Sequence, residues 1–149
     1  MTMIDVLFVC IHNSARSQMA EAYLNAYGKG VFKAESAGLE PGKLNPNVVK
    51  VMALDGIDIS NNTTKSTFDM LKKGTRYTYV VTVCDEASGQ RCPFFPGVLK
   101  TFHWNIEDPS ALKGDYEVIL PELIRIRDEV KKRVKQLILE FEAYAQSRK

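Results

Sequence analysis

The sequence has no long apolar run and little net charge. No apolar stretch approaches the roughly 20 residues that span a bilayer, and residues 1–10 contain acidic Asp5 and no basic residue, unlike a signal peptide. The formal net charge is only +2, too small for the basic field of a nucleic-acid-binding protein. We therefore expect a cytoplasmic protein that binds neither a membrane nor nucleic acid.

Cysteine is also scarce, with only Cys10, Cys84 and Cys92. An odd number without the spacing of a disulfide framework indicates, in a reducing compartment, reactive or buried thiols rather than structural cross-links. The short Cys-x2-Cys spacing of many zinc sites is absent as well, so we expect no metal site.

The remaining composition is that of a globular protein. Hydrophobic residues make up 45% of the chain and charged residues 26%. A length of 149 residues suits one domain, so we expect residues 1–149 to form a single domain, and by default a monomer.

Short apolar runs rich in β-forming residues alternate with stretches of helical periodicity. Strands are expected at Ile4–Val9, Val31–Ala37, Tyr77–Val83 and Leu99–Trp104. Helices are expected around Met19–Tyr27, Pro46–Asp55, Thr67–Lys73 and Val118–Ala143, with Pro121 in the first turn of the last one. This alternation predicts an α/β fold: one three-layer domain with a four-stranded parallel sheet and helices on both faces.

In such sheets ligands bind at the carboxyl ends of the strands. Cys10 directly follows the first predicted strand and Cys84 the third, while Cys92 lies in the polar loop Asp85–Gly97. Cys84 alone could be a small core residue at a strand end. Cys92, on a loop flanked by proline, is harder to explain as packing.

The most informative segment joins the first strand to the first helix. It reads Cys10, Ile11, His12, Asn13, Ser14, Ala15, Arg16, Ser17. A loop of this length that points its backbone N–H groups inward and leads into a helix N-terminus forms a donor site for a tetrahedral oxyanion. The planar fork of Arg16 can bind two oxygens of that anion and hold it over Cys10.

The same donors favour the thiolate form of Cys10, which is the nucleophilic form. Ser17 can donate a hydrogen bond to the sulfur, and Asn13 is a residue type that tolerates the left-handed backbone of a tight loop. The alternative is that Cys10 is a buried strand-end residue and Arg16 a surface residue. The strand before the loop and the helix after it favour the functional interpretation.

A second candidate site residue is Asp108, in Glu107-Asp108-Pro109 just past the fourth strand. Displacing an oxygen from an oxyanion requires a proton donor, and a carboxyl group that faces the loop can act as this general acid. Asp-Pro is also a common turn pair, so the assignment depends on its combination with the Cys10 loop.

This combination resembles the low-molecular-weight tyrosine phosphatase family over the whole chain. The motif is Cys10-x5-Arg16-Ser17 near the N-terminus with Asp108-Pro109 far downstream. Three further runs, Asn13–Glu21, Ser36–Gly38 and Asp58–Ser60, are similar to the thioredoxin-coupled arsenate reductases within that family.

The resemblance implies a relay of three cysteines. Cys10 would attack arsenate held by the loop and Arg16, and Asp108 would protonate the departing oxygen. Cys84 would then attack Cys10, release arsenite and form a Cys10–Cys84 disulfide, after which Cys92 would convert it to a Cys84–Cys92 disulfide. Reduced thioredoxin would restore the thiols, with no bound cofactor, and phosphate or sulfate would mimic arsenate.

One departure concerns a cation. In some of these relatives, residues matching Asn13, Glu21, Ser36 and an aspartate bind potassium beside the loop, but Lys65 stands at the aspartate position here. We predict that the Lys65 ammonium replaces the ion.

Two other functions stay open. A tyrosine phosphatase would use the same loop, but the residues after Asp108-Pro109, Ser-Ala-Leu-Lys-Gly, lack the aromatic side chains that would hold a phenyl ring. A thiol sensor or scavenger would bind zinc or arsenite through the three cysteines, without needing Arg16.

Overall fold

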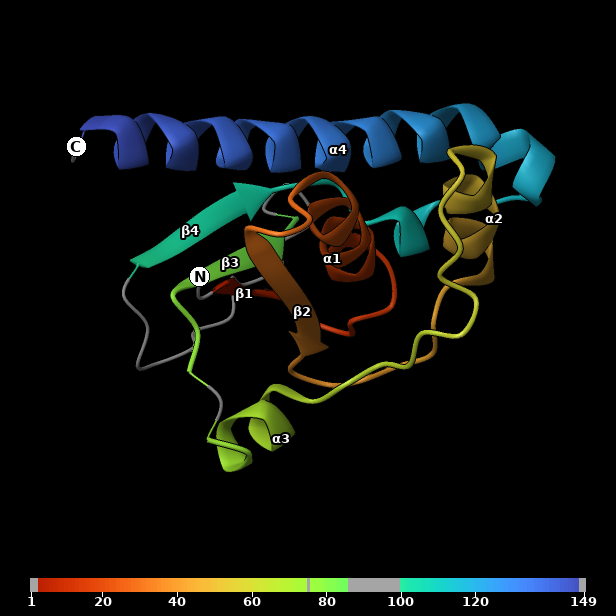
Figure 1. Cartoon of the computed structure of the whole chain (residues 1–149). Coiled ribbons are helices and arrows are strands. Elements are labelled where there is room, and N and C mark those ends of the chain that lie inside the picture. Colours follow the sequence, from red (N-terminus) through yellow and green to blue (C-terminus); the bar gives the residue numbers. More distant parts are fainter. Residues whose placement is uncertain (1–2, 75, 86–99, 148–149) are drawn as a thin grey trace.

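The computed structural model describes residues 3–74, 76–85 and 100–147, and the side chains of these up to residue 142. Its strands are β1 (Ile4–Cys10), β2 (Phe32–Gly38), β3 (Tyr79–Cys84) and β4 (Lys100–Asn105). They form a four-stranded sheet in the order β2-β1-β3-β4 with every pairing parallel (Figure 1). The predicted α/β class with a four-stranded parallel sheet is confirmed.

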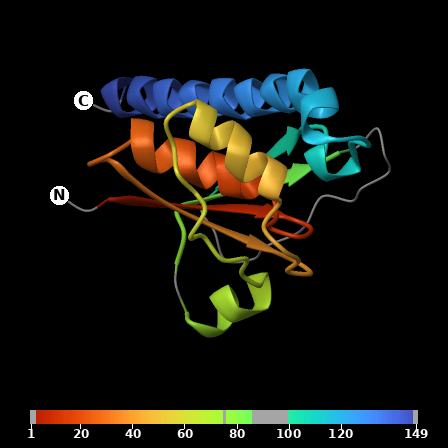
Figure 2. The same cartoon turned by 90° about the vertical axis from the view of Figure 1, so that its right-hand side faces the viewer.

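The helices are divided unequally between the two faces of the sheet. They are α1 (Arg16–Tyr27), α2 (Pro46–Leu54), α3 (Thr67–Lys72) and α4 (Tyr116–Ser147). Figure 2 shows α1, α2 and α4 on one face and α3 on the other. Helices on both faces were predicted, but the sequence did not indicate that, within the described ranges, three of these four helices would share one face.

Alternate residues of β1 form two separate cores. Val6 and Phe8 face the α1 and α4 side, where they pack with Val130 among others, and Leu7 and Val9 face the α3 side. Successive side chains of a strand point to opposite faces, so the almost wholly apolar β1 serves both cores. Burying one such side chain contributes about 1.5–3 kcal/mol, which fixes the strand that leads to Cys10.

The beginnings of α2 and α3 are set by local side chains. Asn45 accepts a hydrogen bond from the Asn47 backbone N–H at 2.9 Å, and Pro46 occupies the first turn of α2, as the sequence predicts. Ser66 caps α3 in the same way, accepting from the Phe68 N–H at 3.1 Å. A cap of this kind satisfies an N–H group that the helix itself leaves unpaired.

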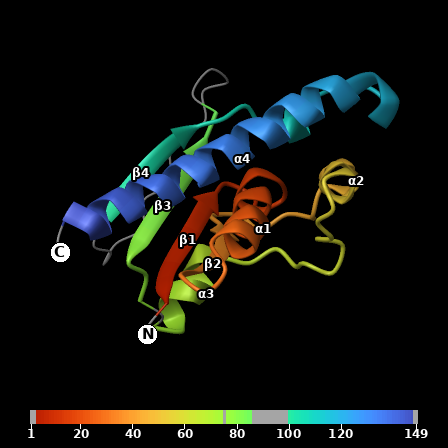
Figure 3. The same cartoon turned by 45° about the horizontal axis from the view of Figure 1, so that its top comes forward.

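Helix α4 is longer than the sequence indicated. It crosses over the sheet (Figure 3), and it begins at Tyr116, so Pro121 lies in its second turn rather than the first. The prediction was wrong because proline most often marks a first turn. Here the buried residues Leu123, Ile126 and Val130 compensate for the one backbone hydrogen bond that Pro121 cannot donate. Among the described residues, no helix combines the length and the apolarity that a membrane span requires.

Candidate active site

The Cys10 loop lies at the carboxyl edge of the sheet, between β1 and α1. In the strand register, Cys10 is opposite Gly38 of β2, and Cys84 is opposite Asn105 of β4. The two cysteines therefore end adjacent strands at the same edge, as predicted from the strand pattern.

The carbonyl groups of the loop are turned outward. Backbone N–H groups of the segment after β2 donate to four of them, as follows: Leu39 to Cys10 (3.2 Å), Glu40 to Ile11 (2.8 Å), Gly42 to His12 (3.0 Å) and Asn45 to Ser14 (2.9 Å). In a trans peptide the N–H points opposite to the C=O. The N–H groups that follow these carbonyls are consequently directed to the inner side of the loop, which is the arrangement of an anion-binding nest.

Gly38 allows the close approach between β2 and the loop. A Cβ atom at this position would lie 2.7 Å from the Ile11 carbonyl oxygen and 2.8 Å from the Asn13 nitrogen. Both contacts are to backbone, which cannot rotate away, so a side chain at residue 38 would deform the loop.

Cys10 receives two hydrogen bonds inside the loop. The Asn13 N–H donates to Cys10 Sγ at 3.1 Å, and Ser17 Oγ lies 2.9 Å from the same sulfur. Asn13 Nδ2 donates to Ser17 Oγ at 2.8 Å, so the Ser17 hydroxyl is oriented to donate its own hydrogen to the sulfur. Both donors are directed at the sulfur of the predicted nucleophile. Asn13 has a φ of 55°, the left-handed conformation expected for it.

Asn13 is itself held in place by Lys65 and by Gln18, and sequence reasoning did not assign a role to Gln18. Its Oδ1 accepts from Gln18 Nε2 at 3.0 Å and from the Lys65 backbone N–H at 2.9 Å. Gln18 is fully buried and also donates to the Thr63 carbonyl oxygen at 3.0 Å, while Asn62 Nδ2 donates to Gln18 Oε1 at 3.1 Å. A polar residue in the first turn of α1, beside the motif, was the one available signal.

Arg16 is the first residue of α1, and its side chain is only 3% exposed. Its Nη1 donates to the Ile106 carbonyl oxygen at 3.0 Å, and its Nη2 lies 3.3 Å from Asp108 Oδ2. Its buried Nε has no hydrogen-bond partner among the described residues. A buried donor without a partner carries a desolvation cost, which an oxyanion bound in the loop would relieve.

Asp108, which lies far from Arg16 in the sequence, faces this guanidinium. Its Oδ1 accepts from the Ser110 backbone N–H at 2.9 Å and caps a short 3-10 helix, Pro109–Ala111. Its own backbone N–H donates to Asp85 Oδ2 at 3.2 Å. The Asn45 backbone N–H donates a hydrogen bond to the Ser14 carbonyl oxygen of the Cys10 loop, and its side-chain Nδ2 donates to Ser110 Oγ at 3.1 Å. The predicted nucleophile, arginine and acid thus share one network of contacts.

The cysteines differ in state. Cys10 is a buried free thiol, 2% exposed. Cys84 is fully buried and disulfide-bonded, so these two are not joined to each other in this structure. Cys92 and most of the loop Asp85–Gly97 lie outside the described residues, and the predicted Cys84–Cys92 disulfide stays a prediction.

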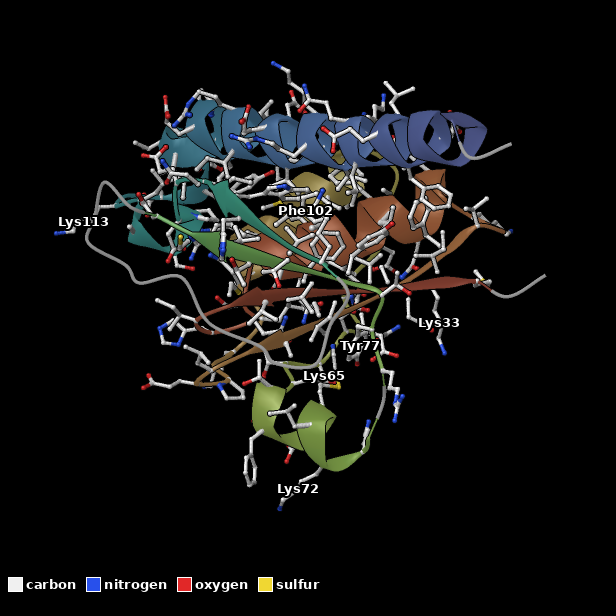
Figure 4. All side chains as sticks on the ribbon, turned by 90° about the vertical axis from the view of Figure 1, so that its left-hand side faces the viewer. Lys33, Lys65, Lys72, Tyr77, Phe102 and Lys113 are labelled. Carbon is white, nitrogen blue, oxygen red and sulfur yellow. The ribbon has the colours of Figure 1, made fainter. Side chains whose placement is uncertain are left out.

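Lys65 lies next to Glu21, close to where the sequence places a cation. Its Nζ is 3.9 Å from Glu21 Oε1 and donates to the Thr63 carbonyl oxygen at 3.0 Å. Ser36 Oγ donates to Glu21 Oε1 at 3.1 Å. Burial raises the pKa of the Glu21 carboxyl above its usual range, and the Lys65 ammonium opposes this rise. Figure 4 shows Lys65 and Tyr77 on the α3 side of the sheet, and Phe102 on the α4 side.

The chain is similar in sequence to a known protein family and to arsenate reductases. Residues 5–147 match the family described as low molecular weight phosphotyrosine protein phosphatase. An arsenate reductase of Bacillus subtilis (strain 168) is 40% identical over 132 residues, which cover 88% of this chain and 92% of the relative.

Solved structures agree with the sequence match. An arsenate reductase in the phosphate binding state superposes with a TM-score of 0.75 at 30% identity, over 93% of this chain and 98% of the other. A thioredoxin-dependent arsenate reductase of Corynebacterium glutamicum gives a TM-score of 0.68 at 26% identity, over 97% of this chain and 64% of the other. The chain therefore belongs to the low molecular weight phosphotyrosine protein phosphatase family, and arsenate reductases are among its relatives.

Proposed function

We propose that this protein is an arsenate reductase that forms arsenite and is reduced again by thioredoxin. One observation carries the proposal: a free thiol, Cys10, lies inside an oxyanion loop, while Cys84 at the end of the neighbouring strand is disulfide-bonded. A phosphatase needs only the first of these features. A second, redox-active cysteine beside the loop is what a reductase requires.

Arsenate would occupy the inner side of the loop. Inward backbone N–H groups and the unpartnered Nε of Arg16 are donors for a tetrahedral oxyanion. Phosphate and sulfate share this geometry and would compete with arsenate. The phosphate binding state of a structurally similar arsenate reductase supports this choice of ligand.

Cys10 begins the chemistry. Its thiolate displaces one oxygen of As(V) and forms an S–As bond, and Asp108 protonates the departing oxygen, which leaves as water. Cys84 then attacks Cys10 Sγ to form the Cys10–Cys84 disulfide. The electron pair of the S–As bond passes to arsenic, which leaves as As(III) in arsenite.

The second half of the cycle restores Cys10. Cys92 attacks Cys84, releases the Cys10 thiol and forms the Cys84–Cys92 disulfide, which the dithiol of reduced thioredoxin then reduces. The two electrons come from thioredoxin, so no cofactor needs to be bound. A thioredoxin-dependent arsenate reductase among the structural relatives supports this electron donor. The expectations of a cytoplasmic and monomeric protein stay predictions.

The test is arsenate-dependent NADPH oxidation in the presence of thioredoxin and thioredoxin reductase. We expect turnover with thioredoxin and none with glutaredoxin in its place. Cys92→Ser should stop steady turnover yet still release arsenite once per prereduced molecule, because the first two cysteines suffice for one reduction. Cys10→Ser should abolish both.

A phosphatase is the competing function, since the loop would accept a phosphate ester. Against it, the five residues that follow Pro109, Ser-Ala-Leu-Lys-Gly, include no aromatic side chain. Rapid hydrolysis of an aryl phosphate together with no arsenate-dependent oxidation would overturn the reductase proposal in favour of the phosphatase.

A further inference from the structure

The pairing of β3 with β4 continues past the last strand residues through a side chain. The register ends with Cys84 opposite Asn105, and the Ile106 N–H still donates to the Cys84 carbonyl oxygen at 2.9 Å. The next bond differs in kind, because the Asp108 backbone N–H donates to a carboxylate oxygen, Oδ2 of Asp85, at 3.2 Å. The Asp85 side chain takes the place of a backbone acceptor where the strands end.

This contact is buried beside the proposed chemistry. Asp85 is 6% exposed and Asp108 is 9% exposed. A buried carboxylate is costly unless it is hydrogen-bonded, and a charged acceptor makes a stronger hydrogen bond than a neutral one. On the protein surface, water could accept the hydrogen bond of the Asp108 backbone N–H. A buried carboxylate as the acceptor instead holds this N–H in one position.

The segment 106–108 is held from two sides. Arg16 binds the Ile106 carbonyl oxygen and the Asp108 carboxylate from the side of the loop. Asp85 binds the Asp108 backbone from the side of β3. The Ile106 backbone is already fixed to Cys84 by its own N–H, whereas the Asp85 bond acts on the backbone of the acid itself.

We propose that Asp85 is a positioning residue, whose carboxylate fixes the Asp108 backbone so that the Asp108 carboxyl group stays directed at the Cys10 loop. The proposal rests on the proposed function in giving Asp108 the role of general acid. Because Asp85 directly follows Cys84, the placement of the acid also depends on the strand end that carries the second cysteine.

The proposal predicts a specific kinetic pattern. Asp85→Ala should lower kcat for thioredoxin-coupled arsenate reduction about tenfold, the effect of one lost hydrogen bond near 1.4 kcal/mol. KM for arsenate should change by less than about twofold, since the loop that binds the anion is intact. Asp85→Asn keeps an oxygen acceptor and should retain most of kcat. Asp128→Ala, an exposed aspartate of α4, is the matched control.

A second measurement does not depend on turnover. Hydrogen exchange at the Asp108 amide, followed by NMR, should be faster in Asp85→Ala than in the native protein and unchanged in Asp85→Asn. An effect of residue 85 through Cys84 alone would lower kcat without altering this exchange, and it would overturn the proposal. Should Asp85→Ala not fold, Asp85→Ser, which is polar but one bond shorter, replaces it in both measurements.

The outcomes separate this proposal from the function on which it rests. A native kcat in Asp85→Ala, or an Asp85→Asn variant as impaired as Asp85→Ala, would overturn the positioning role. If the native protein did not reduce arsenate, the proposed function would fail. The exchange comparison would then still decide whether Asp85 holds the Asp108 backbone.

Discussion

Ser17 Oγ lies 2.9 Å from Cys10 Sγ, and Asn13 Nδ2 holds the hydroxyl at 2.8 Å from its other side. Because the amide of Asn13 donates to Ser17, the hydroxyl hydrogen is left for the sulfur. The hydroxyl that bonds the proposed nucleophile thus comes from the first turn of α1.

Removing the Ser17 hydroxyl should lower the reactivity of Cys10 while leaving anion binding by the loop nearly unchanged. In Ser17→Ala we expect iodoacetamide alkylation of Cys10 at neutral pH to slow about tenfold, the effect of one hydrogen bond to a charged group. Phosphate binding should be nearly native, because Arg16 and the backbone donors remain. Thr101→Ala removes an exposed hydroxyl on β4 and serves as control. Alkylation at the native rate in Ser17→Ala would show that the hydroxyl does not stabilise the thiolate.

The backbone contact at Gly38 can be tested with a matched glycine. In Gly38→Ala the new Cβ would meet the Ile11 and Asn13 backbone at 2.7 and 2.8 Å, whereas in Gly42→Ala it would lie 3.5 Å from His12 Cβ, an ordinary contact. We expect Gly38→Ala to destabilise the protein by about 1–3 kcal/mol and to weaken phosphate binding at least tenfold. Gly42→Ala should be close to native in both respects.

Thermal unfolding and phosphate titration by calorimetry would measure the two effects. Equal losses in Gly38→Ala and Gly42→Ala would contradict the special role of the contact at Gly38.

The Lys65 ammonium should make the loop independent of potassium. Its Nζ lies 3.9 Å from Glu21 Oε1, so a positive charge is already present where the family resemblance predicts the ion. We expect native arsenate turnover to be unchanged when potassium replaces sodium at constant ionic strength. Lys65→Asp should lose activity in sodium and recover part of it in potassium.

The control for Lys65→Asp is Lys73→Asp, which changes an exposed lysine just after α3. The activity of this control variant should not respond to potassium. A clear rise in native activity on adding potassium would disprove the substitution.

Asp55 and its partners Tyr23 and Lys131, which lie away from the loop, should make the free energy of unfolding depend on pH. The Tyr23 hydroxyl donates to Asp55 Oδ2 at 2.8 Å and Lys131 Nζ lies 3.0 Å from it. These partners, the Tyr23 hydroxyl first, hold the pKa of Asp55 below its ordinary value of 3.8. Since the folded pKa is lower than the unfolded one, the stabilisation is present above 3.8 and is lost as pH falls through the folded pKa.

Asp55→Asn removes the charge but keeps an acceptor for Tyr23. We expect it to be less stable than the native protein at neutral pH, with the difference in unfolding free energy shrinking as pH falls below the ordinary aspartate value. Urea unfolding at several pH values would measure this difference. A difference that stays constant down to strongly acidic pH would contradict the role of the Asp55 charge.

Local patterns in the sequence were enough to predict much of the site. Cys10 after an apolar strand, Arg16 at the start of a helix and the left-handed Asn13 all depend on residues close together in the chain. The supporting residues could not be predicted in this way. Gln18 is held by hydrogen bonds to Asn62 and Thr63, and Gly38 is required because the Ile11 backbone lies so close. Neither contact can be predicted from the residue type alone.

The sequence by itself determined where the strands and the Cys10 loop are, because β-propensity, apolar runs and turn residues act over short distances. Only the tertiary structure decided which distant residues meet. Arg16 and Asp108 are brought to 3.3 Å, and Asp85 to the Asp108 backbone, because β1, β3 and β4 run parallel and end at one edge of the sheet. Which groups face one another at that edge depends on strand order and packing across the whole fold, and no local pattern encodes it.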